Sequence, residues 1–322
     1  MKILVVCSGN SQNGKPDFNI NQCFIEEQIS ALHDKGIKTG LFLITGKGVL
    51  GYLRNLPLLR QKVESSQCSF IHAHYGLSGM LAVLQRKVPV VITFHGSDIG
   101  RFPFNLISFV AGQFSAWNIF VSELLKRKLL LQPKNQYSII PCGVDLKKFY
   151  PMDRVRARKI LGLDLSQTYI LFSSSFDIPV KNYQLARKAT QDIKNVHLLE
   201  LKGYTREEVN LLFNACDLLL ITSYSEGSSQ VAKEAMACNC PIVSTTVGMV
   251  GELITNQPGC YLTSYEPDDV RHKIELAIAF GKKTNGRARI LNLNNNLVAD
   301  QLIDVFERVL ERNGKENRNE NL

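Results

Sequence analysis

Residues 218–252 (LLLITSYSEGSSQVAKEAMACNCPIVSTTVGMVGE) constrain the fold more than any other stretch of the chain. The apolar run Leu218–Ile221 predicts a fully buried strand, and the polar, glycine-containing residues 223–229 predict a turn after it. Residues 230–238 favour a helix, which Pro241 ends before the next apolar run begins. A strand, a loop, a helix and a second strand in this order form the repeating unit of a parallel sheet.

Two carboxylates, Glu226 and Glu234, lie eight residues apart, the first in the predicted loop and the second in the predicted helix. Open α/β sheets bind anionic ligands where a loop at the carboxyl end of a strand leads into a helix N-terminus. Taken alone, each glutamate is more commonly a solvated surface charge. The choice between a binding site and a charged surface therefore depends on the rest of the chain.

Short apolar runs alternate with helix-forming segments along the whole chain, in two halves of similar size. A length of 322 residues suits two domains of about 150 residues each. We predict an α/β fold with two doubly wound, Rossmann-like parallel sheets that face each other across a cleft. The predicted N-terminal domain spans residues 1–148 and the C-terminal domain 149–296, with a linker at 146–152. A helix over 297–312 is expected to pack back on the N-terminal domain, before a disordered tail at 313–322.

Composition excludes several classes of protein. Apolar residues make up 45% and charged residues 21% of the chain, as in ordinary globular proteins, and no apolar run approaches the roughly 20 residues of a spanning helix. The eight cysteines show no framework spacing, which predicts free thiols in a reducing, cytoplasmic compartment. His72 and His74 alternate at the end of a predicted strand without further ligands at metal spacing, so we expect no metal site and no metal cofactor.

No common nucleotide fingerprint is present. No G-x-G-x-x-G follows a strand, and residues 40–48 have the wrong spacing for a P-loop and lack Ser or Thr after the lysine. The sequence therefore argues against a hydride-transfer enzyme and against a kinase.

Several short motifs occur in one order along the chain. They are FHGSD at Phe94–Asp98, IPCGVD at Ile140–Asp145, a loop with Lys181 within residues 172–185, NACD at Asn214–Asp217, and S-x-x-E-G-x₆-E-A-M-A-C-x-x-P-I-V-S-T from Ser223. Each is weak alone, but the ordered set resembles the family-4 retaining glycosyltransferases of the GT-B fold, over nearly the whole chain. The resemblance implies a nucleotide-sugar donor site in the C-terminal domain and an acceptor site in the N-terminal domain.

The resemblance implies a role for each matching residue of the C-terminal domain. Glu234 would accept hydrogen bonds from the ribose hydroxyls, which are charge-assisted and about twice as strong as neutral ones. Glu226 would contact hydroxyls of the donor sugar, and Lys181 would neutralise the leaving diphosphate. The backbone N–H groups of Gly227, Ser228 and Ser229 would hold the phosphates or the sugar at the helix N-terminus.

Three further residues have a role by the resemblance and a structural alternative beside it. His95 would approach the donor sugar from the N-terminal domain, although a structural histidine at a strand end is the alternative. Asp98 would shape the loop that carries His95, or would simply cap a helix. Tyr204 would flank the nucleobase, or is an exposed turn tyrosine.

The chain departs from the family pattern at one place that matters. Many members carry an arginine at the end of the strand before the lysine loop, where this chain has Ser173–Ser175. The charge of the diphosphate would then be met by Lys181, backbone donors and serine hydroxyls, Ser175 among them. A single point charge thus replaces a bidentate fork plus a point charge.

Charge is uneven along the chain and suggests an anionic partner. Residues 1–150 contain 17 basic and 8 acidic residues, and residues 151–322 contain 21 of each, so the net charge of +9 belongs to the first half. Lys126, Arg127, Lys128 and Lys134, interleaved with Leu129–Leu131, are candidates for resting on anionic headgroups at the inner face of a membrane; a solvated basic face is the alternative.

We therefore expect a retaining, metal-independent glycosyltransferase that moves a sugar from a UDP- or GDP-linked donor to a glycan or lipid-linked acceptor in cell-surface polysaccharide synthesis. A nucleotide-sugar epimerase of the same fold is the enzymatic alternative. A nucleic-acid-binding protein is the alternative from another class, and no nucleic acid is expected because aromatic residues are not interleaved with the basic ones.

Overall fold

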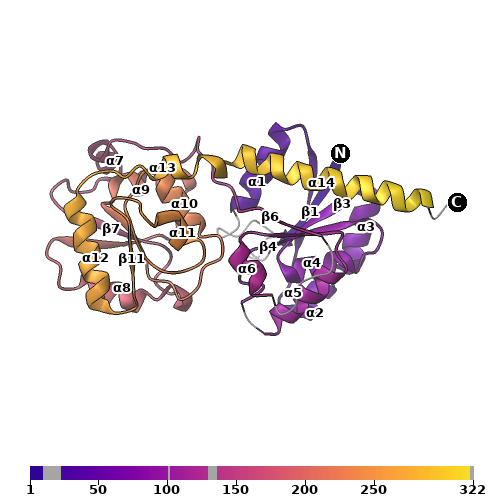
Figure 1. The fold of residues 1–322 in the computed structure, drawn as a ribbon, viewed down its shortest axis with the longest axis horizontal. Coiled ribbons are helices and arrows are strands. Elements are labelled where there is room, and N and C mark those ends of the chain that lie inside the picture. The colour runs from indigo at the N-terminus through magenta and orange to yellow at the C-terminus, as the bar shows by residue number, and fades with distance from the viewer. Residues whose placement is uncertain (10–22, 101, 130–135, 320–322) are drawn as a thin grey trace. The chain divides into compact units, whose positions relative to one another are not determined.

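The computed structural model describes residues 1–9, 23–100, 102–129 and 136–319, with side chains through residue 314. The chain divides into two compact units (Figure 1). Unit 1 comprises Met1–Gly143 and Asn295–Leu322, and unit 2 comprises Val144–Asn294. The predicted boundaries differ from these in placing residues 144–148 and 295–296 in the other unit.

Unit 1 is built on a six-stranded sheet in which every pairing is parallel, in the order β2-β1-β3-β4-β5-β6. Its strands are β1 (Lys2–Ser8), β2 (Lys38–Ile44), β3 (Phe70–His74), β4 (Val90–Phe94), β5 (Trp117–Phe120) and β6 (Tyr137–Ile139). The strand order reverses between β1 and β3. Such a reversal defines the switch point of a doubly wound sheet, outside whose carboxyl end ligands bind.

Helices cover the sheet of unit 1. They are α1 (Cys23–Asp34), α2 (Gly48–Leu53), α3 (Leu56–Ser66), α4 (Gly76–Val83), α5 (Phe104–Gln113), α6 (Glu123–Arg127) and α14 (Asn295–Asn319). Arg54 and Asn55 separate α2 from α3. Proline is tolerated in the first turn of a helix, so Pro57 opens α3, and the Asn55 amide donates to the carbonyls of Thr45 and Gly51.

The last helix, α14, belongs to the core of unit 1 (Figure 1). Phe306 lies against Phe70 of β3, with ring centroids 4.9 Å apart, and Lys35 after α1 forms an ion pair with Asp300. The helix continues to Asn319, where the sequence predicted disorder from residue 313. Gly314 lies inside it, and a single glycine costs a helix only about 1 kcal/mol.

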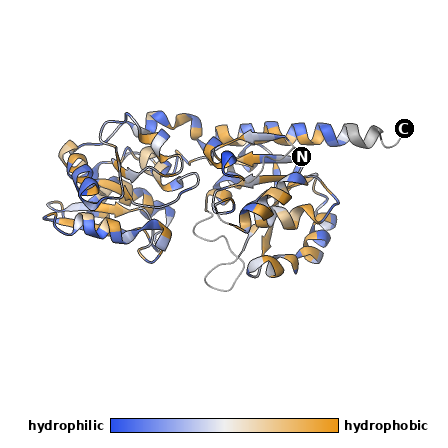
Figure 2. Cartoon of the chain, turned by 60° about the horizontal axis from the view of Figure 1, so that its bottom comes forward, coloured by the Kyte–Doolittle hydropathy of each residue, from blue (hydrophilic) through white to orange (hydrophobic). Residues whose placement is uncertain are grey.

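Unit 2 repeats the architecture with a five-stranded parallel sheet in the order β11-β10-β9-β7-β8. Its strands are β7 (Thr168–Phe172), β8 (Val196–Glu200), β9 (Leu218–Ile221), β10 (Ile242–Thr245) and β11 (Tyr261–Thr263). Its helices are α7 (Arg154–Leu161), α8 (Tyr183–Thr190), α9 (Arg206–Ala215), α10 (Gln230–Ala237), α11 (Val250–Ile254), α12 (Pro267–Phe280) and α13 (Gly286–Arg289), with 3₁₀ turns at Pro179–Lys181 and Leu291–Leu293. The predicted pair of doubly wound parallel sheets is confirmed, and Figure 2 shows the apolar strands inside each unit.

The segment predicted to be a linker, residues 146–152, is part of unit 2. Phe149 is completely buried against Phe213, and Arg287 donates to the carbonyl oxygens of Leu146 and Phe149 at 2.7 and 2.6 Å. Burial of one phenylalanine side chain contributes roughly 2 kcal/mol, which is enough to fix a short segment on a folded surface.

Among the described residues, no helix combines the length and the apolar character that crossing a bilayer requires.

Candidate active site

The switch point of unit 2 lies between β7 and β9, because the strand order reverses there. Ser173 follows β7 directly, and its N–H donates to the carbonyl oxygen of Leu220 in β9 at 3.1 Å. The loop 222–229 leaves the carboxyl end of β9 and enters α10. The stretch that the sequence placed at the centre of the fold therefore lies where doubly wound sheets bind their ligands.

The structure brings Lys181 and Glu226 together at this edge. Lys181 Nζ lies 2.7 Å from Glu226 Oε1, and the Ser223 hydroxyl donates to the same oxygen at 2.6 Å. The lysine is positioned through its backbone, since the Thr222 hydroxyl lies 3.0 Å from its carbonyl oxygen. An ammonium group has three donors, so the bond to Glu226 leaves Lys181 able to bind an anionic oxygen as well.

The loop between the two glutamates has its backbone donors available. Among the described residues, none accepts a hydrogen bond from the N–H of Gly227, Ser228 or Ser229. The loop lies close to Gly248, where a Cβ atom would come within 2.5 Å of the Gly227 carbonyl oxygen. Gly248 also has a φ of +53°, so both the close approach and the backbone conformation require glycine.

Glu234 is held by an arginine that the sequence motifs did not reveal. Arg206, the first residue of α9, donates to Glu234 Oε1 at 2.6 Å and lies over the Phe149 ring at 4.6 Å. Glu234 is buried, and burial of a carboxylate is costly without such a partner. A carboxylate has about four acceptor positions, so the bond from Arg206 alone does not fill them, and the contact of Glu234 with ribose hydroxyls stays a prediction. The capping box of Thr205 and Glu208 fixes the start of α9, and it is the only sequence signal near Arg206.

Two predicted donor-site residues are placed less favourably. The Ser175 hydroxyl lies within hydrogen-bonding distance of Asp177 and of Glu200 Oε1, so its one proton serves a carboxylate and not a phosphate. Tyr204 follows Gly203, whose φ is +80°, and its side chain is exposed. Its proposed contact with a nucleobase stays a prediction.

In unit 1, Asp98 ties together the loops that follow β3 and β4. Its buried carboxylate accepts from the N–H groups of Gly96 at 2.7 Å, Gly76 at 3.0 Å and His95 at 3.2 Å. Burial raises the pKa of Asp98 to about 6, against the lowering effect of these N–H groups. Asp98 thus shapes the loop that carries His95 and also bonds to the first residue of α4.

His95 is held on both of its ring nitrogens by residues of unit 1. Nε2 lies 3.0 Å from His74 Nδ1, and Nδ1 lies 3.5 Å from the sulfur of Cys142. Cys142 belongs to the IPCGVD motif. The Tyr75 ring lies against the imidazole, with centroids 4.5 Å apart. Sequence reasoning noted His74 and Cys142 separately, but the distance of 68 positions between them hid their common contact with His95.

A second buried histidine, His72, lies beside His74, with tilted rings whose centroids are 4.4 Å apart. Burial lowers the pKa of His72 to about 3 and the pKa of His74 well below its usual value, so both rings are neutral at neutral pH. Below pH 6.5 the unfolded chain binds protons on these histidines that the folded chain does not, and stability falls as the pH decreases. Asp98 acts in the opposite direction between pH 6 and 4, because the folded state holds its proton.

The contribution of His72 is measurable in a His72→Gln variant. Between pH 6 and 4, the free energy of unfolding of the wild type should fall relative to the variant by about 1.4 kcal/mol per pH unit. Urea denaturation followed by fluorescence reports on unit 1, because the single tryptophan, Trp117, lies in β5. A difference that does not change with pH would contradict the lowered pKa.

Other motif residues stabilise the fold. Asp217 of the NACD motif accepts from Arg154 at 2.5 Å and from Arg158 at 2.8 Å, and the Asn214 amide donates to the carbonyl oxygen of Tyr150. In the described part of the chain, no three His, Cys, Asp or Glu side chains are grouped so that they could hold a metal ion.

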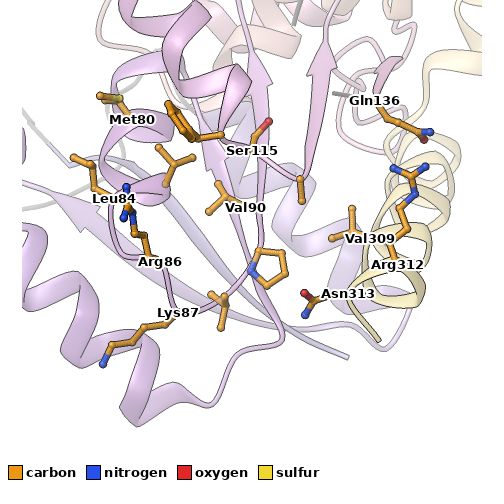
Figure 3. Close-up of a pocket in the computed structure, with 15 residues that line it drawn as sticks. Met80, Leu84, Arg86, Lys87, Val90, Ser115, Gln136, Val309, Arg312 and Asn313 are labelled. Atoms are coloured by element: carbon orange, nitrogen blue, oxygen red, sulfur yellow. The ribbon is translucent and has the colours of Figure 1, made fainter. Parts of the chain in front are cut away.

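Unit 1 also has a cavity of about 910 Å³ that contains none of the predicted site residues. It lies at the amino ends of β4 and β5, on the edge of the sheet away from His95 and Asp98. Arg86 and Arg312 lie on opposite sides of it (Figure 3). The cavity is therefore separate from the candidate site.

Two doubly wound parallel sheets with a polar switch point in the second unit define the GT-B fold of glycosyltransferases. The crystal structure of HepE (Alr3699) from Anabaena, in complex with UDP and glucose, has this fold; it superposes with a TM-score of 0.73 at 17% identity, over 96% of this chain and 100% of that one. Family models match both units: Glycosyltransferase Family 4 over residues 23–148, and Glycosyl transferases group 1 over residues 169–279. The chain therefore belongs to the glycosyltransferases that these two models together describe.

Curated relatives of the chain are named as glycosyltransferases. The D-inositol 3-phosphate glycosyltransferase of Mycobacterium sp. (strain KMS) is 25% identical over 276 residues, which cover 70% of this chain and 63% of the relative. The putative teichuronic acid biosynthesis glycosyltransferase TuaC of Bacillus subtilis is 28% identical over 211 residues, covering 57% of this chain and 54% of the relative. Each match thus spans less than two thirds of the length of the relative.

Proposed function

We propose that the protein transfers a sugar from a nucleotide-sugar donor, UDP- or GDP-linked, to a glycan or a lipid-linked acceptor, with retention of configuration and without a metal ion. The observation that carries the proposal is the grouping of Lys181, Glu226 and the 227–229 backbone donors at the switch point of unit 2. Membership of a glycosyltransferase family supports the reaction class. HepE, which has a similar fold, was solved with UDP and glucose, and this supports a nucleotide-linked donor.

Each group at this edge has a task in the proposed reaction. Lys181 and the helix N-terminus of α10 supply positive charge to the departing diphosphate, the task that a metal ion performs in other enzymes. Glu226 orients the donor sugar through its hydroxyls, and Glu234 binds the ribose. Catalysis is then mainly positioning and stabilisation of the leaving group, and no glycosyl–enzyme intermediate is proposed.

His95 is proposed to contact the donor sugar. Because both of its ring nitrogens have partners in unit 1, the imidazole is positioned in advance, and little rotamer entropy is lost when a ligand binds.

The role in cell-surface polysaccharide synthesis is also part of the proposal. It is supported by the teichuronic acid glycosyltransferase among the relatives and by the basic character of residues 1–150. An anionic membrane surface, at the inner face of the cytoplasmic membrane, would then be a partner of unit 1.

The apolar residues suggested for membrane contact require revision. Leu129 is buried in the core, and the Lys126 ammonium lies 2.7 Å from the Tyr137 hydroxyl, while residues 130–131 and 134 lie outside the described residues. The lipid-facing surface we propose instead comprises Phe102, Phe104, Leu106, Leu124, Arg127 and Lys128, all exposed.

These residues belong together because the Asn105 amide donates to the carbonyl oxygen of Lys128 at 2.9 Å, so the start of α5 lies beside the end of α6. Flotation with vesicles tests the surface. The protein should float with phosphatidylglycerol vesicles more than with phosphatidylcholine vesicles, and the double substitution Phe102→Ser and Phe104→Ser should abolish flotation. Equal flotation of variant and wild type would reject this surface.

A thermal-shift screen against UDP- and GDP-linked sugars, followed by product analysis, tests the proposed function. We expect one donor to stabilise the protein and to be consumed faster when an acceptor glycan or lipid is added, with EDTA having no effect. Conversion of the donor to its epimer without any acceptor would instead establish an epimerase, and stabilisation by no nucleotide sugar would reject the donor site.

A further inference from the structure

The helix of the donor site contains a lysine whose side chain is completely buried. Lys233 is the fourth residue of α10, after the N-cap Ser229, and has no exposed surface. Side chains on a helix point back toward its N-terminus. The Lys233 ammonium accordingly lies beside the loop that precedes the helix, where Nζ donates to the Ser228 hydroxyl oxygen at 2.6 Å.

This contact determines what Ser228 can do. An ammonium group only donates hydrogen bonds, so Ser228 Oγ must act as the acceptor toward Lys233. The hydroxyl proton of Ser228 is then left to be donated to another group, and the bond from a cation strengthens it as a donor. Ser228 therefore offers a donor to a group that accepts, such as a phosphate oxygen.

Two neighbouring hydroxyl groups are also able to donate a hydrogen bond to a ligand. Ser229 Oγ and Ser173 Oγ are buried, with 4% and 5% of their residues exposed, and neither has a hydrogen-bond partner among the described residues. Buried polar groups without partners are rare in folded proteins and call for a ligand or a water molecule. Ser173 and the loop that carries Ser228 and Ser229 follow the adjacent strands β7 and β9.

Charge points to the same kind of ligand. The N-terminus of α10 carries the positive end of the helix dipole, and the Lys233 ammonium adds a second positive charge beside it. A buried positive potential of this kind favours an anion. The site also lacks the arginine that many family members have where this chain has Ser173–Ser175.

We propose that Lys233 is a positioning residue for the diphosphate of the donor, acting through Ser228. Its ammonium group supplies a second positive charge from α10, in addition to that of Lys181. This charge takes the place of the arginine that is absent at the end of β7. This inference rests on the proposed function, and it assigns the phosphate-binding part of the donor site to Lys233, Ser228 and Ser229 in addition to Lys181.

A Lys233→Met variant tests the inference, because methionine fills a similar volume without charge. Calorimetric titration with UDP and GDP, and with uridine and guanosine, separates binding of the phosphates from binding of the nucleoside. For the diphosphate that the wild type binds, we expect affinity to fall roughly ten- to hundredfold, as when a hydrogen bond to a charged group is lost. Affinity for the matching nucleoside should not change, whereas a general disturbance of the site would weaken both.

A Ser228→Ala variant leaves Lys233 in place and serves if Lys233→Met does not fold. It should lose affinity for the diphosphate and keep affinity for the nucleoside. Where Lys233→Met folds, the two losses should not add in the double variant, because both substitutions remove the same hydrogen-bonded pair. Ser225→Ala is the matched control, an exposed serine of the same loop that should bind like the wild type.

The outcomes separate this inference from the proposed function. If the wild type binds a diphosphate and Lys233→Met binds it equally well, Lys233 has no role in phosphate binding, and the donor site still stands. Additive losses in the double variant would lead to the same conclusion. Absence of diphosphate binding by the wild type would overturn both.

Discussion

Replacing Glu234 by alanine is expected to lower the affinity for the nucleoside diphosphate at least about 100-fold. Two charge-assisted hydrogen bonds to the ribose would be lost, and each contributes roughly 1.5–3 kcal/mol. The fold should survive, since Arg206 keeps its contact with the Phe149 ring and its side chain is partly exposed to water. Isothermal titration calorimetry with UDP and GDP measures the loss.

Two further variants control this experiment. Glu207→Ala removes an exposed carboxylate of α9 that has no proposed role, and it should bind like the wild type. Glu234→Gln keeps the shape and one acceptor, and we expect an intermediate affinity because the bonds are no longer charge-assisted. Wild-type affinity in Glu234→Ala would remove Glu234 from the donor site.

The sheets of the fold could be predicted from the sequence because parallel strands in doubly wound proteins are short apolar runs bounded by turn residues. Leu218–Ile221 shows this pattern and forms β9 with those bounds. The segment 146–152 shows why prediction failed elsewhere. Its lysines and proline suggest a linker, yet Phe149 is buried by Phe213 and Arg287, which are distant in sequence and were not foreseeable partners.

The candidate site was predictable where a residue belongs to a motif and not where it only supports one. Glu226 and Lys181 were expected at one edge, and they form an ion pair there. Arg206 and Lys233 were missed because a basic residue at a helix start, or within QVAKEAMA, has the pattern of a solvated charge. Only the packing of α10 shows that Lys233 has no access to solvent.

Substitution of Lys181 by methionine is expected to reduce kcat by about 10²- to 10³-fold, with a smaller change in KM for the donor. The ammonium charge stabilises the diphosphate most strongly when it leaves, so its loss raises the transition state more than the ground state, by roughly 3–4 kcal/mol. Glu226 would keep the hydrogen bond from Ser223, and the loop should therefore stay in place. Initial rates of donor consumption, hydrolysis included, measure the effect.

Lys202→Met is the matched control, because Lys202 is an exposed lysine of the same unit whose partner is the exposed Asp177. A surface ion pair of this kind contributes about 0–1 kcal/mol to stability, and its loss should leave kcat unchanged. If Lys181→Met raised KM alone, the lysine would bind the donor equally well in the ground state and in the transition state. The proposed stabilisation of the leaving group would then have to come from the N-terminus of α10 and from Lys233.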